Sequence, residues 1–565
     1  MSTLNKIKQN IAKSINLALK KDVVNASDLI YPPKPEFGDL SLPCYALAKQ
    51  AGKSATEMAE FLVGKVSSDY VASTKAIGPF INFTFNKTRL APGVIAEAQT
   101  KNYGFNKSGK NKKVMIEFSN ANTHKEYHVG HLRNLSYGDA VTRIMAANGY
   151  KALPVSYIND FGIHVAKTIW ALEKFFKGAA ETDNKGYFLG KVYVRACQEL
   201  ENNETGKAEV VEIMKKIESR NGADYKLWQK TRKWSIDGMA KIYKEMGVKF
   251  TQIFYESEVI EQGLDMVAKL YQKEILTKSQ GAIIANLEKY NLGVLVFMRS
   301  DGTALYPVAD LPLAEEKFRK YKIDKSVYVV DVRQSLYFKQ LFKLLELLGY
   351  KKDMVHLGYE FVKLPEGMMS SRTGQIITYG DLRAQALKRA VSEIKKRHKA
   401  WSEKKVAEVA GKLVNGALKF EMLKVGADKV ITFDLEQALR FDGFTAAYLQ
   451  YTGARINSII RKTRNSQLAT QIKYEMLSED KEQAIIMKLA KYPEIVESAG
   501  KNYAPDELAK FIFELAQEFN DYYHAVPVLK AKTDIRQARL ALISAVRQTI
   551  ANGLGLLGIE VMEEM

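Results

Sequence analysis

Three of the chain's seven histidines lie in one short segment, residues 117–133. His124, His128 and His131 are spaced i, i+4 and i+7, so one helix could direct all three at a zinc ion. Gly130 is a poor residue for a helix interior, and no HExxH motif, cysteine or acidic ligand stands at metal spacing nearby. We therefore expect no metal site. In the favoured interpretation, His128 and His131 donate hydrogen bonds to nucleotide phosphates and Gly130 lets the nucleotide approach the backbone. The alternative is a surface loop that happens to be rich in histidine.

The elements around this segment support the phosphate interpretation. An apolar stretch at residues 114–116 predicts a strand before it, and apolar residues at helical spacing from Leu132 to Met145 predict a helix after it, with Gly149 as a C-cap. In an open parallel sheet, ligands bind at the carboxyl ends of the strands. A helix N-terminus at that place offers free N–H groups and the positive end of the helix dipole, which suit phosphate.

The pattern that follows predicts an α/β fold with a doubly wound, Rossmann-type, largely parallel sheet. Residues 152–158 and 326–330 have the composition of strands, and a helix is expected at 336–348. Between them, residues 165–290 are charged and mostly helical in pattern, and we interpret them as an insertion. Residues 294–308 then predict a hairpin, with strands at 294–298 and 304–306 around an Asp-Gly turn.

Changes of texture divide the chain into three regions. Residues 1–110 resemble an α/β module of their own, with an alternating strand at 79–85, and the polar stretch 106–113 reads as a linker. Residues 111–434 form the Rossmann-type domain, and residues 435–565 have a helical pattern throughout. A GKS tripeptide at 52–54 resembles the end of a P-loop, but it follows a helical pattern and lacks the motif's first glycine, so we reject it.

Composition describes a water-soluble, basic chain. At 565 residues it has room for about three to four domains. Its 84 basic and 64 acidic residues give a net charge of +20, which favours a polyanionic partner, although a generally basic surface would also account for it. No apolar run reaches the roughly 18 residues of a membrane span. Cys44 and Cys197 are too few for a disulfide framework or a cysteine-based zinc site, so we expect a cytoplasmic protein.

Several motifs in a fixed order resemble those of the class I aminoacyl-tRNA synthetases, and specifically of the arginyl-tRNA synthetase family. The resemblance extends over nearly the whole chain. It implies a ligase that joins L-arginine to tRNA(Arg) in two steps, using ATP with Mg²⁺, with tRNA needed before the first step, and we expect a monomer. The motifs are HVGH at 128–131, EGMMSSRTG at 366–374, FDGFTAAYLQY at 441–451, the ending at 539–560, and EFGD at 36–39 with GPFINF at 78–83 in a tRNA-contacting N-terminal domain.

An arginine pocket can also be reasoned from chemistry. A guanidinium group presents five donors in a plane, and carboxylates recognise it best. Glu117 immediately precedes the histidine segment, and Asp310 follows Tyr306 by one helical turn. Alone, each has an ordinary alternative as an edge charge or a helix cap. The resemblance implies that Glu117, Tyr306 and Asp310 line the side-chain pocket, and that the amino and carboxylate end is held by Asn122, His128 and Gln334.

The second signature departs from the usual class I form. Met368 and Ser371 stand where two lysines are common, Thr373 stands where many arginyl enzymes have lysine, and Arg372 remains. In the resembled family a lysine just before the first signature compensates, and Lys125 holds that place. A solvated loop lysine is the alternative. The resemblance thus implies catalytic roles for Lys125, His128, His131 and Arg372, with further ATP contacts from Gly130, Met369, Ser370 and Ser371.

Aromatic residues of the helical region could meet tRNA. Tyr448 and Tyr451 could stack on unpaired anticodon bases, although packing between helices is equally compatible with their setting. Three other functions stay open: a class I synthetase for another amino acid, a pseudo-synthetase that binds RNA without chemistry, and a smaller nucleotidyltransferase. The acidic pair argues against another amino acid, and the intact histidine signature argues against a pseudo-synthetase. The length and the +20 charge argue against a smaller nucleotidyltransferase.

Overall fold

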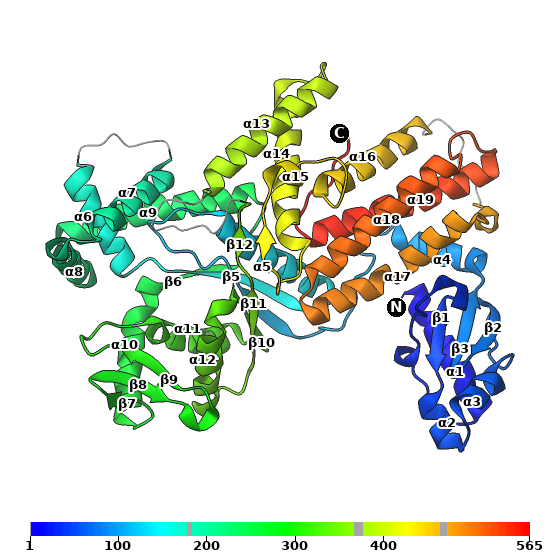
Figure 1. Cartoon of the computed structure of the whole chain (residues 1–565), viewed down its shortest axis with the longest axis horizontal. Helices are drawn as coiled ribbons and strands as arrows, with labels where there is room; N and C mark the ends of the chain where they lie inside the picture. Colours follow the sequence, from blue (N-terminus) through cyan, green and yellow to red (C-terminus); the bar gives the residue numbers. More distant parts are fainter. Residues whose placement is uncertain (1, 178–183, 366–376, 464–471) are drawn as a thin grey trace.

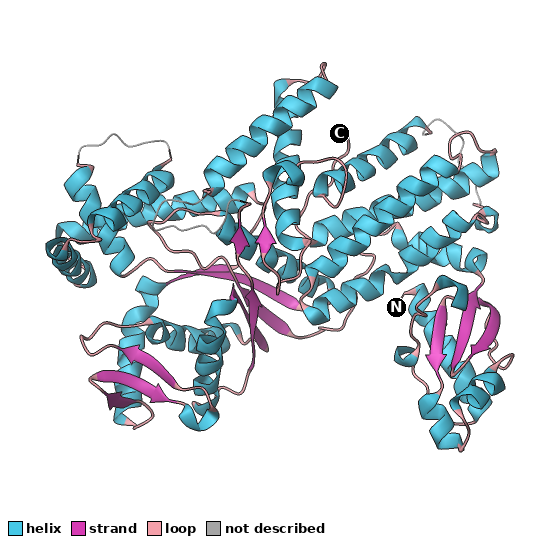
Figure 2. Ribbon diagram, viewed as in Figure 1, coloured by secondary structure: helices cyan, strands magenta, loops and turns pink. Residues whose placement is uncertain are grey.

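The computed structural model describes residues 2–565 apart from 178–183, 366–376 and 464–471. Its centre is a parallel sheet (Figure 2), as the sequence predicts, and its strands follow the order β11-β10-β4-β5-β6. The strands are β4 (Lys113–Glu117), β5 (Lys151–Ile158), β6 (Gln252–Tyr255), β10 (Lys325–Asp331) and β11 (Asp353–Tyr359).

The central strands β4 and β10 are buried on both faces, which accounts for their almost continuous apolar runs. On β4, Val114 and Ile116 point into the larger core, which also contains α5 (Val129–Ala147) and the C-terminal helices. Met115 points to the opposite face, into a second core made with α10 (Glu256–Gln272), α11 (Tyr306–Tyr321) and α12 (Ser335–Leu347). Strand alternation then directs Glu117, the last residue of β4, toward α11.

The segment 165–290, which the sequence analysis interprets as an insertion, is mostly helical, but only its first part lies apart from the central sheet. Four helices lie at one end of the molecule (Figure 1). Residues 252–255, however, form β6 of the central sheet, and residues 277–298 form a small antiparallel sheet, so the expected extent is wrong. A four-residue edge strand between two amphipathic helices is too short to give a recognisable pattern in the sequence. The helices are α6 (Ile163–Phe175), α7 (Lys185–Glu199), α8 (Glu204–Glu218) and α9 (Gly222–Glu245), and the small sheet contains β7 (Thr277–Ser279), β8 (Ala282–Asn286) and β9 (Val294–Met298).

The predicted hairpin at 294–308 is correct only in its first strand and turn. Met298 forms an isolated bridge with Ala304, and the Leu305 N–H donates to the Phe297 carbonyl at 2.8 Å. Tyr306 does not continue a strand but begins α11, with Pro307 in the first turn. Proline near a helix start is favourable because its missing N–H would have no partner there.

The N-terminal module packs against the C-terminal helices (Figure 1). The Tyr103 hydroxyl donates to the Leu489 carbonyl at 2.7 Å, and the Tyr31 hydroxyl donates to Glu494 at 2.6 Å. The module contains α1 (Thr3–Leu19), β1 (Leu40–Pro43), α2 (Tyr45–Ala51), α3 (Ala55–Leu62), β2 (Val71–Ile77), β3 (Phe80–Phe85) and α4 (Lys87–Ala98). The α2 helix ends just before the rejected GKS tripeptide.

The C-terminal region is a helical bundle, as expected. It includes α16 (Ala446–Lys462), α17 (Asp480–Asn502), α18 (Pro505–Ala525) and α19 (Thr533–Leu556). A hairpin of α13 (Tyr379–Arg397) and α14 (Glu403–Leu423) leads into it, with β12 (Val362–Lys363), β13 (Ile431–Thr432) and α15 (Leu435–Ala438) nearby. Lys419 of α14 forms a buried ion pair with Asp139 of α5 at 2.8 Å, which joins this hairpin to the helix that begins at the histidines. Within the described part of the chain, no helix is long and apolar enough to cross a membrane.

Candidate functional site

One cavity at the carboxyl ends of β4, β5 and β10 gathers most of the predicted site residues. Its volume of 680 Å³ falls within the roughly 300–1,000 Å³ typical of small-molecule sites. Lys125 instead lines a neighbouring cavity of 280 Å³ between α9 and α13. Met369, Ser370, Ser371 and Arg372 lie outside the described residues. The predicted residues that line the larger cavity are Glu117, Asn122, His128, Gly130, His131, Tyr306, Asp310 and Gln334.

The two signature histidines cap the helix that follows them. His128 is the N-cap of α5, and its Nδ1 accepts a hydrogen bond from the Gly130 N–H at 3.1 Å. The Nδ1 of His131 accepts in turn from the His128 N–H at 3.2 Å. The two rings lie 3.9 Å apart between centroids. A neutral imidazole whose Nδ1 accepts must carry its proton on Nε2, so each ring keeps one N–H donor for a ligand.

Electrostatics keeps these rings neutral. Burial, with the charge of Lys125 nearby, lowers the pKa of His128 to about 4. Burial also holds the pKa of His131 well below its usual value, assisted by His128 and Lys125. At neutral pH both histidines are therefore hydrogen-bond donors rather than fixed cations. Their N–H groups can stabilise negative charge that develops on a phosphate. Because the rings are neutral, this avoids the desolvation cost of a buried imidazolium.

A side chain at position 130 would crowd the His128 ring. A Cβ at this position would lie 3.0 Å from both Cε1 and Nδ1 of the His128 ring. Glycine at position 130 therefore has two explanations. It leaves space for the His128 ring, and, as the sequence analysis proposes, it would let a nucleotide approach the backbone.

The acidic wall of the cavity combines the end of β4 with one face of α11. Glu117 is 3% exposed at the end of β4 and forms an ion pair with Lys317 of α11. Its other carboxylate oxygen accepts from the Asn120 side-chain amide at 3.0 Å. On α11 the residues at i, i+4, i+7 and i+11 face the cavity, so the predicted placement of Tyr306 and Asp310 on one helix face is observed. These residues are Tyr306, Asp310, Leu313 and Lys317.

Asp310 is the less engaged of the two predicted carboxylates. It accepts a hydrogen bond from the Tyr337 hydroxyl of α12. Burial raises the pKa of Asp310 to about 6, partly offset by the bond from Tyr337. Tyr306, in contrast, is 63% exposed at the rim of the cavity. The arrangement offers a carboxylate to a cation that enters past Tyr306.

Glu256, which the sequence analysis does not single out, is a third carboxyl group close to this wall. It is the first residue of α10. Its Oε2, the Tyr157 hydroxyl and the Asn159 Oδ1 are buried and have no hydrogen-bond partner among the residues that the structure describes. Burial and the charges of Asp160 and Asp310 raise the pKa of Glu256 to about 8. Glu256 directly follows β6, and because that four-residue strand is not evident in the sequence, its position gave no usable signal.

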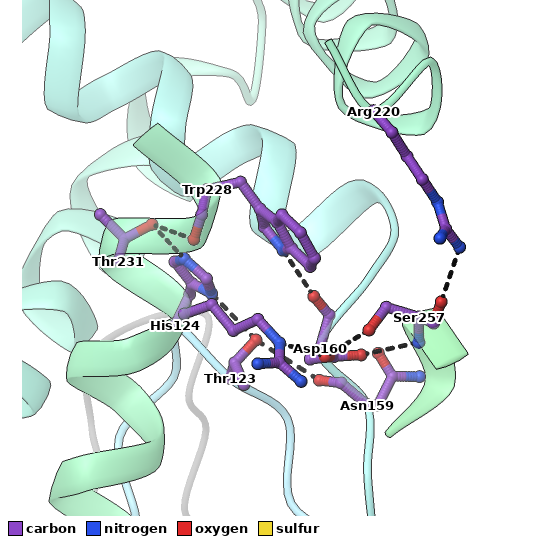
Figure 3. A network of polar contacts seen from close by, with 9 residues as sticks. Thr123, His124, Asn159, Asp160, Arg220, Trp228, Thr231 and Ser257 are labelled. Atoms are coloured by element: carbon purple, nitrogen blue, oxygen red, sulfur yellow. Dashed lines mark hydrogen bonds and ion pairs between the residues drawn. The ribbon is translucent and has the colours of Figure 1, made fainter. Parts of the chain in front are cut away.

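His124 is buried away from the cavity, and both of its ring nitrogens lie within hydrogen-bond distance of threonine hydroxyls. It is fully buried, with φ of +62°, and burial lowers its pKa to about 3. Its Nδ1 lies 2.9 Å from the Thr123 hydroxyl and its Nε2 2.8 Å from the Thr231 hydroxyl of α9 (Figure 3). Among the residues with described positions, no three His, Cys, Asp or Glu side chains are grouped to hold a metal.

A buried acidic network fixes the loop after β5. The side chain of Asp160 is fully buried, pairs with Arg232 of α9, and accepts from both the N–H and the hydroxyl of Ser257, at 2.9 and 2.7 Å (Figure 3). The Trp228 indole N–H donates to the Asp160 carbonyl at 2.9 Å. Through the parallel bridge between Asn159 and Asn122, this network positions two amides that line the cavity.

The two predicted tRNA-contacting tyrosines differ in their surroundings. The Tyr448 hydroxyl accepts from Asn520 at 2.8 Å, and its ring packs 5.3 Å from that of Phe513. Tyr451 is 38% exposed. Packing accounts for Tyr448, whereas Tyr451 remains available to a partner.

Comparison with known proteins covers all three regions of the chain. Residues 94–433 match the family described as tRNA synthetases class I (R), catalytic domain. Residues 5–85 match the arginyl tRNA synthetase N terminal domain, and residues 449–565 match the DALR anticodon binding domain.

Individual proteins match over their full length. The chain is 37% identical to an arginine–tRNA ligase of Bdellovibrio bacteriovorus, covering 97% of this chain and 95% of that one. It is 32% identical to the arginine–tRNA ligase of Clostridium acetobutylicum, covering 99% and 100%. Among solved structures, the arginyl-tRNA synthetase of Thermus thermophilus superposes with a TM-score of 0.82 at 25% identity, covering 100% of both chains.

Proposed function

Because this chain belongs to the arginyl-tRNA synthetase family and is an arginine–tRNA ligase, we propose how its residues divide the work of the reaction. The family's reaction has two steps. The arginine carboxylate attacks the α-phosphate of ATP, giving arginyl-adenylate and pyrophosphate. A ribose hydroxyl of the terminal tRNA adenosine then attacks the adenylate, and AMP leaves. No covalent protein nucleophile is needed, so the protein's contribution is positioning and charge stabilisation.

The guanidinium of arginine lies against the acidic wall. Asp310 accepts from it, Glu117 completes the wall and Tyr306 covers it from the rim. The α-amino and carboxylate end is held by Asn122, His128 and Gln334, which puts the attacking oxygen beside the histidine pair. The observation that carries this proposal is the single cavity that brings an acidic wall and two neutral histidine donors together.

The phosphates of ATP lie at the N-terminus of α5. The Nε2–H groups of His128 and His131 donate to them, and the positive end of the α5 dipole adds a favourable field. Lys125 and Arg372 supply positive charge, and Gly130 lets the phosphates approach. Met369, Ser370 and Ser371 add contacts from the second signature. Mg²⁺ enters as part of the Mg·ATP substrate, held chiefly by phosphate oxygens.

The tRNA contacts all three regions. In this proposal residues 1–110 contact tRNA, residues 111–434 carry the chemistry, and residues 435–565 bind the anticodon, with Tyr451 stacking on a base. The net charge of +20 supports many phosphate contacts. The attacking hydroxyl is the 2′-OH, and tRNA(Arg) must be bound before the first step. We also propose that the enzyme acts as a monomer in the cytoplasm.

Replacing one carboxylate tests this assignment. Asp310→Asn should raise the KM for arginine by at least about 100-fold in ATP–pyrophosphate exchange with tRNA present, because a charged hydrogen-bonded contact is lost. The KM for ATP should stay within about twofold. Asp301→Asn is the matched control, since Asp301 lies in an exposed turn and its described hydrogen bond is from the Thr303 N–H of the same turn. An unchanged arginine KM in Asp310→Asn would refute the placement of arginine.

A further inference from the structure

A chain of hydrogen bonds runs from the loop after β4 into the helix α9 (Figure 3). The Thr231 hydroxyl donates to carbonyls of its own helix, that of Leu227 at 2.9 Å and that of Trp228 at 3.2 Å. Its oxygen is then left to accept from the Nε2–H of His124, 2.8 Å away. A neutral imidazole with its proton on Nε2 accepts at Nδ1, and the Thr123 hydroxyl, 2.9 Å from Nδ1, is the donor. The tautomer of His124 therefore follows from its partners.

The backbone of His124 is fixed as well as its ring. The His124 N–H donates to the Ser235 hydroxyl of α9 at 2.9 Å. Its φ of +62° lies in the left-handed region, which non-glycine residues adopt only rarely. Before this turn the chain pairs with Asn159, whose carbonyl accepts from the Thr123 N–H at 2.9 Å. After it the next residue, Lys125, lines the neighbouring cavity.

Two separate anchors hold the functional residues of this loop. Asn122 is held from the side of β5, through its parallel bridge with Asn159. Lys125 directly follows His124, and two residues later the Tyr127 carbonyl accepts from the first N–H of α13 at 2.7 Å. The segment that carries Lys125 is thus held at its start by α9 and at its end by α13. A change at the α9 contact should displace Lys125, while Asn122 keeps its own anchor.

Helix α9 connects the lobe formed by α6–α9 with the centre of the molecule. Trp228, near the start of α9, belongs to the core of this lobe, whereas Tyr243, near its end, belongs to the larger core. Thr231 and Ser235 lie between them on the same buried face of the helix. The contact to His124 is therefore made from a helix that is packed at both ends, and such a helix can hold the loop rigidly.

We propose that His124 is a positioning residue: held by Thr231 and Ser235, it sets the place of Lys125 beside the phosphates of ATP. The inference rests on the proposed role of Lys125 in the first step of the reaction. It has two consequences that a purely structural role of His124 does not share. Loosening the contact should slow adenylation without changing the KM for arginine, and it should have no further effect once the Lys125 side chain is removed.

ATP–pyrophosphate exchange by the full-length enzyme, at saturating ATP and tRNA, tests the first consequence. Thr231→Val keeps the shape of the side chain but removes the acceptor for His124, so the rate should fall at least about tenfold while the arginine KM stays within about twofold. Thr231→Ser keeps the hydroxyl and should stay within about twofold of the wild-type rate. Thr168→Val is the matched control and should also keep that rate, since Thr168 is a fully buried threonine of the same lobe whose described hydrogen bond goes to the His164 carbonyl of its own helix at 3.0 Å.

A double variant tests the second consequence. Lys125→Ala/Thr231→Val should exchange within about twofold of Lys125→Ala, because two changes that act through one group are not additive. The inference is overturned if the double variant is slower than Lys125→Ala by the full factor of Thr231→Val, or if Thr231→Val keeps the wild-type rate or slows no more than Thr168→Val. A wild-type rate in Lys125→Ala is a separate result, since it refutes the proposed role of Lys125 itself.

Thermal melting shows whether Thr231→Val folds. Should it fail to fold, Ser235→Ala decides instead, because it removes the acceptor of the His124 N–H. A loss of exchange of at least about fivefold that is absent in the Lys125→Ala background supports the inference. No loss, or a loss of equal size in both backgrounds, overturns it.

Discussion

The affinity for arginine should depend on pH through Asp310. Burial raises the pKa of this carboxyl to about 6. It is then about nine-tenths ionised at pH 7 and about one-tenth ionised at pH 5, whereas a guanidinium stays charged throughout. An acid loses its charge as the pH falls through its pKa, so the contact weakens on the acidic side. The dissociation constant for arginine should rise about tenfold from pH 7 to pH 5.

Calorimetric titration of arginine at half-unit steps of pH measures this directly. The histidines should not contribute between these limits, because the pKa of His128 is lowered to about 4 and that of His131 lies well below its usual value. Asp310→Asn should bind arginine weakly and with a flat profile, while Asp301→Asn should follow the wild type. Melting temperatures at each pH control for acid unfolding. A flat wild-type profile, or the same slope in Asp310→Asn, would refute the assignment of Asp310.

Three further predictions address the rest of the site. Gly130→Ala should lower the adenylation rate roughly tenfold or more with little change in arginine KM, because the new Cβ would displace the His128 ring; pyrophosphate exchange at saturating arginine measures this. Lys125→Ala should lower the same rate by more than about tenfold, and a rate within a few-fold of wild type would exclude Lys125 from the phosphate site. Asp160→Asn should lower the free energy of unfolding by about 3 kcal/mol, because it leaves Arg232 without its buried partner; urea unfolding measures the change, and a loss below about 1 kcal/mol would contradict the account of this network.

Periodicity and chemistry were enough to predict the elements that carry the site. The strand before Glu117, the helix that starts at the histidines, and the strand that ends at Asp331 all follow from apolar patterns that are long and regular. Tyr306 and Asp310 could be placed on one helix face from their spacing alone. The same rule could have found Lys317, eleven residues after Tyr306, but a lysine in an otherwise charged stretch gives no sign that it is buried.

The remaining features depend on contacts between distant segments. Strand β6 is only four residues long, and it joins the sheet because β5 offers it an unpaired edge. The role of His124 is decided by Thr231, 107 residues away, and that of Asp160 by Arg232 and Ser257. Lys125 precedes His128 by three residues, yet the turn between them directs it to the neighbouring cavity. Sequence separation alone carries no information on any of these pairings.

ATP–pyrophosphate exchange with each of the twenty amino acids, with and without tRNA, tests the central claim most directly. The account predicts exchange with arginine that depends on added tRNA. In Asp310→Asn, arginine at micromolar to millimolar concentration should no longer support exchange. Exchange with a different amino acid would contradict the acidic pocket of Glu117, Tyr306 and Asp310. Absence of exchange with any amino acid, from folded protein that still binds tRNA, would contradict the assignment of His128 and His131 to the phosphates of ATP.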